Sequence, residues 1–90
     1  MMEEYGIAAF RSRSQVLQLE AAAKQAGIEG RIVSTPRAAA AGCGLSFMVA
    51  QKDLARLQQL IRQRKYPTLI GLYRVDTSSG RTRLQVYSSG

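Results

Sequence analysis

The chain has no histidine and only one cysteine, Cys43, among its 90 residues. Without histidine, neither a Ser-His-Asp triad nor a Cys-His pair can form, because the base that activates the nucleophile is missing. A single cysteine cannot close an internal disulfide, which favours a reducing compartment. Nor can it supply the four ligands of a structural metal site, so we predict neither a metal nor a cofactor.

Long apolar segments are also missing. No apolar run approaches the roughly 18 residues that a membrane-spanning helix needs. Residues 1–4 are acidic rather than basic, and the apolar segment after them is too short for a signal peptide. We therefore expect a cytoplasmic protein without a membrane partner.

The charge of the chain is strongly positive. Thirteen lysines and arginines against six acidic residues give a net charge of +7. Such a balance points to an anionic partner, whether nucleic acid, an acidic protein or a small anion. The arginines are scattered rather than gathered in one run, so a solvated basic surface explains the charge equally well.

The first third of the chain predicts a strand followed by a helix. Residues 5–10 are apolar at nearly every position, which is typical of a buried strand. Ser12, with Gln15 three residues later, has the spacing of a capping box and predicts a helix start. Gly27 is expected to end this helix, as glycine often does beyond the last turn.

The rest of the chain completes a βαββαβ order, the split arrangement of ferredoxin-like α+β domains. Strands are predicted at residues 31–35, 45–49 and 68–75, and an amphipathic helix at residues 52–65. We expect an antiparallel sheet with strands one and three central and both helices on one face.

The C-terminal segment predicts an addition to this domain. Residues 76–80 are rich in turn formers, and residues 82–87 alternate like a half-buried strand. A fifth strand would therefore form a hairpin with the fourth. We divide the chain into a ferredoxin-like domain at residues 1–75 and a C-terminal hairpin extension at residues 76–90.

The segment between the second and third strands holds the candidate reactive residue, Cys43. Gly42 and Gly44 flank it and allow positive φ angles and a close approach of the backbone to a ligand. Exposed N–H groups of such a turn can bind an anion, and Arg37 adds a permanent positive charge. These groups would lower the pKa of the thiol and make it a nucleophile. Alternatively Cys43 is a small buried hydrophobe, as free cysteines usually are.

The same segment carries a recognisable signature. Thr35-Pro36-Arg37, then five residues, then Cys43-Gly44-Leu45 resembles the bacterial family described as putative selenium/sulfur carrier protein-like, which has a TPR…CG motif at this place. The resemblance covers about residues 5–75, and includes Phe10-x-Ser12, Ala26-Gly27-Ile28 and Asp53-Leu54.

This resemblance implies a function. Cys43 would hold sulfur or selenium as a persulfide or selenosulfide, and Thr35, Pro36, Arg37 and Gly44 would be its motif partners. The protein partners would be sulfur or selenium donors and acceptors. A carrier or binding protein is favoured over a turnover enzyme, because transfer by one thiol needs no other catalytic group.

Two other functions stay open on the sequence. In the first, the chain is a basic binding module for RNA or an acidic protein, and Cys43 is structural. Tyr5, Tyr73 and Tyr87 lie on predicted strands and could form a stacking surface for bases. The basic-Gly-aromatic-Gly-aromatic signature of RNA-binding domains of this fold is absent, so nucleic acid is not the expected partner. In the second, the domain oligomerises through a sheet edge.

Overall fold

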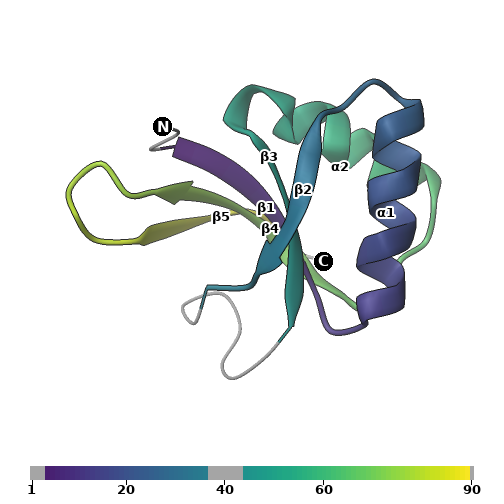
Figure 1. Cartoon of the computed structure of the whole chain (residues 1–90), viewed down its shortest axis with the longest axis horizontal. Coiled ribbons are helices and arrows are strands. Elements are labelled where there is room, and N and C mark those ends of the chain that lie inside the picture. The colour runs from purple at the N-terminus through teal and green to yellow at the C-terminus, as the bar shows by residue number, and fades with distance from the viewer. Residues whose placement is uncertain (1–3, 37–43, 90) are drawn as a thin grey trace.

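The computed structural model describes residues 4–36 and 44–89 of the chain. Its elements are β1 (Glu4–Phe10), α1 (Arg13–Gln25), β2 (Gly30–Ser34), β3 (Leu45–Ala50), the 3-10 turn η1 (Gln51–Asp53), α2 (Leu54–Gln63), β4 (Leu69–Asp76) and β5 (Arg83–Ser89). The strands form one antiparallel sheet in the order β2-β3-β1-β4-β5. Both helices lie on the same side of this sheet (Figure 1).

This arrangement confirms the predicted α+β fold. β1 and β3 are the inner strands of the βαββ(α)β core, and β5 extends the sheet as a hairpin partner of β4. Neither helix in the described ranges 4–36 and 44–89 is long and apolar enough to cross a membrane.

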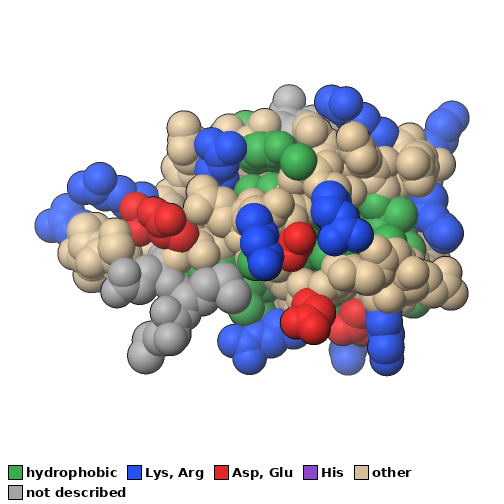
Figure 2. All heavy atoms as spheres, turned by 90° about the horizontal axis from the view of Figure 1, so that it is seen from above, with side chains coloured by type: hydrophobic (Ala, Val, Ile, Leu, Met, Phe, Trp, Pro, Cys, Tyr) green, Lys and Arg blue, Asp and Glu red, His purple; other side chains and the backbone are tan. Residues whose placement is uncertain are grey.

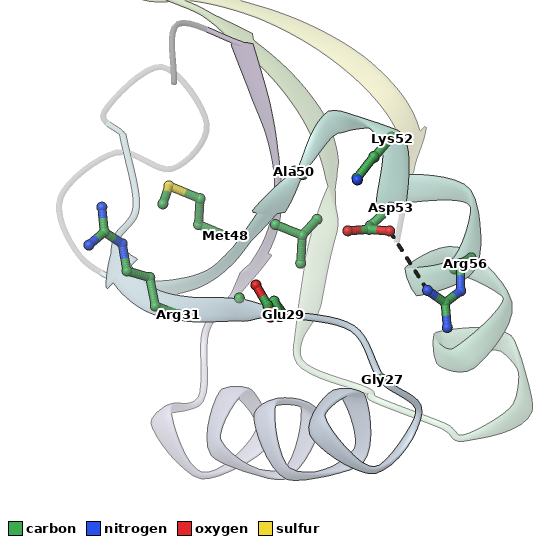
Figure 3. Close-up of a pocket in the computed structure, with 10 residues that line it drawn as sticks. Gly27, Glu29, Arg31, Met48, Ala50, Lys52, Asp53 and Arg56 are labelled. Atoms are coloured by element: carbon green, nitrogen blue, oxygen red, sulfur yellow. Dashed lines mark ion pairs between the residues drawn. The ribbon is translucent and has the colours of Figure 1, made fainter. Parts of the chain in front are cut away.

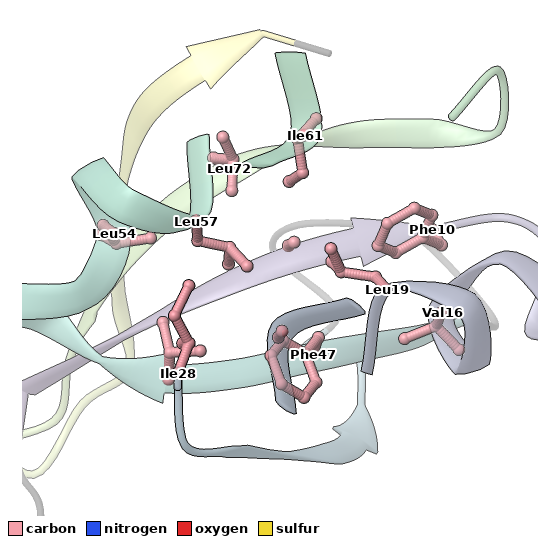
Figure 4. Close-up of a cluster of buried hydrophobic side chains, with 12 residues drawn as sticks. Phe10, Val16, Leu19, Ile28, Phe47, Leu54, Leu57, Ile61 and Leu72 are labelled. Carbon is pink, nitrogen blue, oxygen red and sulfur yellow. The ribbon is translucent and has the colours of Figure 1, made fainter. Parts of the chain in front are cut away.

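The central strand β1 is buried on both faces. Ile7, Ala8, Ala9 and Phe10 are all completely inaccessible, which explains why the apolar residues of this segment run continuously instead of alternating. On the helix side, Phe10 contributes to a core built with side chains from α1, β3 and α2 (Figure 4). Other large members of this core are Val16, Leu19, Phe47, Leu54, Leu57, Ile61 and Leu72.

Gly6 lets α2 approach the centre of the sheet. A Cβ atom at this position would overlap the side chain of Leu54, the first residue of α2. Leu54 is itself almost fully buried, so it has little room to move away. The glycine is therefore a packing requirement, because its backbone surface receives the leucine side chain.

The start of α1 differs from the expected capping box. Ser12 is the N-cap residue, as predicted, but its side chain makes no capping hydrogen bond. Gln15 does not reach back to the cap either, because its Oε1 accepts a hydrogen bond of 2.9 Å from the backbone N–H of Thr68 and another from the Thr68 hydroxyl. The glutamine thus joins α1 to the segment before β4. The predicted capping-box interaction is not formed, so that prediction is wrong.

The other end of α1 is joined to α2. Gly27 follows the helix with a φ of 77°, which confirms it as the residue that ends α1. Just before it, the carbonyl oxygen of Ala26 accepts a hydrogen bond of 2.7 Å from the guanidinium of Arg56 on α2. This donor satisfies a carbonyl that has no partner within the helix, and its charge complements the helix dipole.

The contact between Gly6 and Leu54 can be tested by a double-mutant cycle. We expect Gly6→Ala to lower the free energy of unfolding by about 1–3 kcal/mol, because the added methyl group overpacks the core. In a Leu54→Ala background the same substitution should cost much less, since the overlapping side chain has been removed. Urea denaturation of the four proteins measures both costs, and equal costs would contradict the packing argument.

Candidate functional site

The TPR…CG motif spans the connection between β2 and β3. The structure describes only some of the residues of this motif. Thr35, Pro36 and Gly44 are described, whereas Arg37, Gly42 and Cys43 lie outside the described residues. The roles expected for these last three therefore stay predictions. What the structure supplies is the geometry of the two ends of the motif.

Thr35 connects the two ends through its backbone and its side chain. Its N–H donates a hydrogen bond of 3.2 Å to the carbonyl oxygen of Gly44, so the chain re-enters the sheet beside the point where it left. Its hydroxyl shares a hydrogen bond of 2.7 Å with the hydroxyl of Ser46 on β3. Thr35 thus extends the pairing of the two strands by one residue beyond β2.

Ser46 is the polar partner that the sequence did not single out. Its residue is completely buried, and it is the one polar residue buried in the described part of the chain. A buried hydroxyl without a partner would lower the free energy of unfolding by about 1–3 kcal/mol. The hydrogen bond to Thr35 therefore stabilises the fold. The signal in the sequence was a lone polar residue inside the apolar segment Leu45–Ala50.

Gly44 is required by both conformation and space. Its φ of 135° lies where residues with a side chain are rarely found, as expected for a glycine beside the cysteine. A Cβ atom there would also lie 2.9 Å from the carbonyl oxygen of Phe10 and 3.5 Å from Oγ1 of Thr35. Any other residue at position 44 would push the end of the motif away from β1.

The end of the sheet where the motif lies is also the end from which α1 starts. Phe10 pairs with Leu45. Arg11 and Arg13, which follow β1, therefore lie at the same end of the strands as Gly44. Both arginines are exposed, and the first turn of α1 has no acidic residue. No local sequence pattern links these two arginines with the motif, because they precede it by more than 20 residues.

A hollow lies at the opposite end of β2 and β3 from the motif. It has a volume of 650 Å³ and collects charged side chains of both signs around its rim (Figure 3). Arg56 in this hollow is already engaged, because it binds the Ala26 carbonyl and lies 3.8 Å from Asp53. The remaining charged residues are Glu29, Arg31 and Lys52. None of its lining residues belongs to the motif, and its positive and negative charges largely cancel.

Metal binding finds no support in the described residues. No group of three or more acidic, cysteine or histidine side chains that could hold an ion occurs within 4–36 and 44–89. Basic side chains, by contrast, are spread over the face that Figure 2 shows, with acidic ones between them. This distribution agrees with the scattered positions of the arginines in the sequence.

The three tyrosines do not form one stacking surface. Tyr5 and Tyr73 project from the same face of the sheet, opposite the helices, at diagonal positions of the β1–β4 pair. Val86 on β5 lies opposite Tyr73, and Tyr87, at the bulge that follows, packs on the helix side of the sheet. There its ring packs at the core margin, and the guanidinium of Arg74 lies 5.0 Å from its centre. The proposed three-ring platform for bases is therefore wrong.

The hydroxyl pair at the motif can be tested with isosteric variants. Thr35→Val keeps the shape but leaves the Ser46 hydroxyl buried without a partner, so we expect a loss of about 1–3 kcal/mol in the free energy of unfolding. Thr35→Ser keeps the hydroxyl and serves as the control, with a clearly smaller loss. Combining Thr35→Val with Ser46→Ala should recover part of the stability. Equal losses for the valine and serine variants would contradict this role.

The sequence also matches a known protein family. Residues 5–70 match the family model described as "Putative Se/S carrier protein-like". No curated protein and no solved structure matches the chain. The matched segment begins in β1 and ends in β4, and it contains the whole motif between Thr35 and Gly44. Because it covers well over half of the sequence, the chain belongs to the Se/S carrier protein-like family.

Proposed function

We propose that this protein carries one sulfur or selenium atom on Cys43, as a persulfide or selenosulfide. The observation that carries the proposal is the family match across the complete TPR…CG motif. The described ends of the motif support it. Thr35 joins the two ends of the motif through its backbone bond to Gly44 and its hydroxyl bond to Ser46.

The transfer needs one thiolate and no oxidant. Cys43 Sγ attacks the outer sulfur or selenium of a donor persulfide or selenosulfide, forming a new bond to that atom. The donor's own bond to the atom breaks, and its sulfur leaves as a thiolate that takes up a proton. An acceptor thiolate then attacks the same outer atom and releases Cys43. Each step exchanges one bond for another, so one cysteine suffices.

The residues around Cys43 have separate roles in this proposal. Arg37 supplies a fixed positive charge that favours the thiolate and the persulfide anion. Gly42 and Gly44 leave their N–H groups free of neighbouring Cβ atoms. Pro36 sets the direction in which the chain leaves β2, because its φ is fixed. Thr35 holds the base of the segment.

The surroundings strengthen the electrostatic part of the proposal. Arg11 and Arg13 lie at the same end of the sheet as Gly44. The whole chain has thirteen basic and six acidic residues. A positive field lowers the pKa of a nearby thiol and attracts partners with acidic surfaces. The donor and acceptor are therefore proteins with acidic faces in the bacterial cytoplasm. In this scheme residues 1–75 form the carrier domain and residues 76–90 extend its sheet.

Mass spectrometry tests the cargo directly. After incubation with a low-molecular-weight persulfide, the intact protein should gain about 32 Da for sulfur, or about 79 Da with a selenium donor. A thiol reductant should remove the added mass, because the outer atom is bound only through a disulfide-like bond. Cys43→Ser should acquire no such mass while keeping the circular dichroism of the wild type. Wild-type protein that gains nothing from either donor would rule the carrier out.

Alkylation kinetics test the thiolate. The rate at which iodoacetamide modifies Cys43 should rise with pH around a pKa below the value of about 8.5 for a free thiol. Arg37→Gln should move that pKa upward, because it removes the positive charge within the motif that favours the thiolate. Lys52→Gln removes the same charge at the opposite end of β3 and should leave the pKa nearly unchanged. A cysteine that reacts only after unfolding would instead be a buried core residue.

A further inference from the structure

A second feature of the molecule lies on the helix layer, where α1 meets the segment after α2. A hollow of 390 Å³ opens between them. On α1 its lining positions follow one face of the helix, at spacings of three, one and three residues. Alanines form the middle of this face and glutamines form its two ends, so the hollow has an apolar floor with amide groups at its rim. The lining residues are Gln18, Ala21, Ala22, Gln25, Arg64, Lys65 and Tyr66.

Arg64 and Lys65 differ from the arginine that precedes them. Arg62 belongs to the last turn of α2, where a positive charge complements the helix dipole. Arg64 has left the helix, with φ of −125° and ψ of 144°, and both it and Lys65 line the hollow. The helix dipole explains the position of Arg62, but it does not explain the two further cations beyond the helix end.

Tyr66 gives the hollow a fixed wall and one more donor. Its ring meets Phe10 edge to face, with centroids 5.7 Å apart and planes at 79°. Burial raises the pKa of the Tyr66 hydroxyl, and the nearby charge of Arg64 opposes this only in part. The hydroxyl therefore keeps its proton at neutral pH and can donate a hydrogen bond.

The charge of this hollow is not balanced. No carboxylate lines it, whereas the hollow at the start of β2 mixes cations with Glu29 and Asp53. The nearest acidic residue of α1 in sequence is Glu20, which lines a different hollow together with Lys24. Two cations, two amides and a phenol thus meet around one space without an internal counterion.

We propose that this hollow binds a small oxyanion of the phosphate type. The guanidinium of Arg64 can donate two parallel hydrogen bonds to phosphate oxygens, and Lys65 adds a mobile point charge. The amides of Gln18 and Gln25 and the Tyr66 hydroxyl complete a set of neutral donors. The volume is at the small end of ligand pockets, which run from about 300 to 1,000 Å³, and so favours a small molecule over a polymer. None of the residues that line the hollow belongs to the TPR…CG motif.

Titration with inorganic phosphate, followed by ¹H–¹⁵N NMR at constant ionic strength, tests the site. We expect saturable shifts in the side-chain amides of Gln18 and Gln25 and in the backbone of residues 64–66. The double variant Arg64→Gln/Lys65→Gln should weaken binding about tenfold or more, because it removes both charge-assisted contacts. Arg62→Gln removes the same kind of charge two residues earlier and should change the affinity by less than about twofold.

A parallel titration with glycerol phosphate identifies the source of the anion. Tighter binding than inorganic phosphate indicates a phosphorylated small molecule, and equal binding indicates the free ion. Three results would overturn the site: no saturable shifts with either probe, shifts that spread evenly over the basic surface, or an Arg62→Gln variant that weakens binding as much as the double variant. None of them bears on the persulfide at Cys43, which is measured by mass.

Discussion

The structure depends on the burial of β1 between two neighbouring strands and beneath both helices. This strand pairs with β3 on one side and β4 on the other, and four consecutive residues of it are inaccessible to solvent. Gly6 within it receives Leu54, so that α2 can rest on the centre of the sheet. A strand held in this way cannot shift its register by one residue, because such a shift would turn every buried side chain to the other face.

That register also determines the base of the motif. Because Phe10 is paired with Leu45, the backbone of Gly44 crosses the end of β1 at a distance that leaves no space for a Cβ atom. The next strand then places Thr35 beside Ser46, where the two hydroxyls satisfy each other inside the sheet. The conformational demand on a glycine and the chemical demand on a threonine therefore have one origin, the pairing of β3 with its two neighbours.

The two proposed activities use different parts of this frame. The TPR…CG motif begins and ends at one end of the sheet. Arg11 and Arg13, before and at the start of α1, add positive charge there. The hollow proposed to bind an oxyanion, between α1 and residues 64–66, belongs to the helix layer. It depends on the packing of Tyr66 against Phe10, the last residue of the central strand. Phe10 thus contributes to both, through its carbonyl oxygen in one place and its ring in the other.

Local patterns in the sequence were enough to predict the strands, the two helices, their order and the glycine that ends α1, because periodicity and turn preference act over a few residues. The TPR…CG spacing likewise pointed to the family and to Cys43. The tertiary structure alone decided that Gln15 binds Thr68 rather than the helix cap, since its partner lies 53 residues away. It also decided that Ser46 needs Thr35, and that Tyr87 faces the helices. Such outcomes depend on which distant groups meet in a buried space, and no local pattern contains that information.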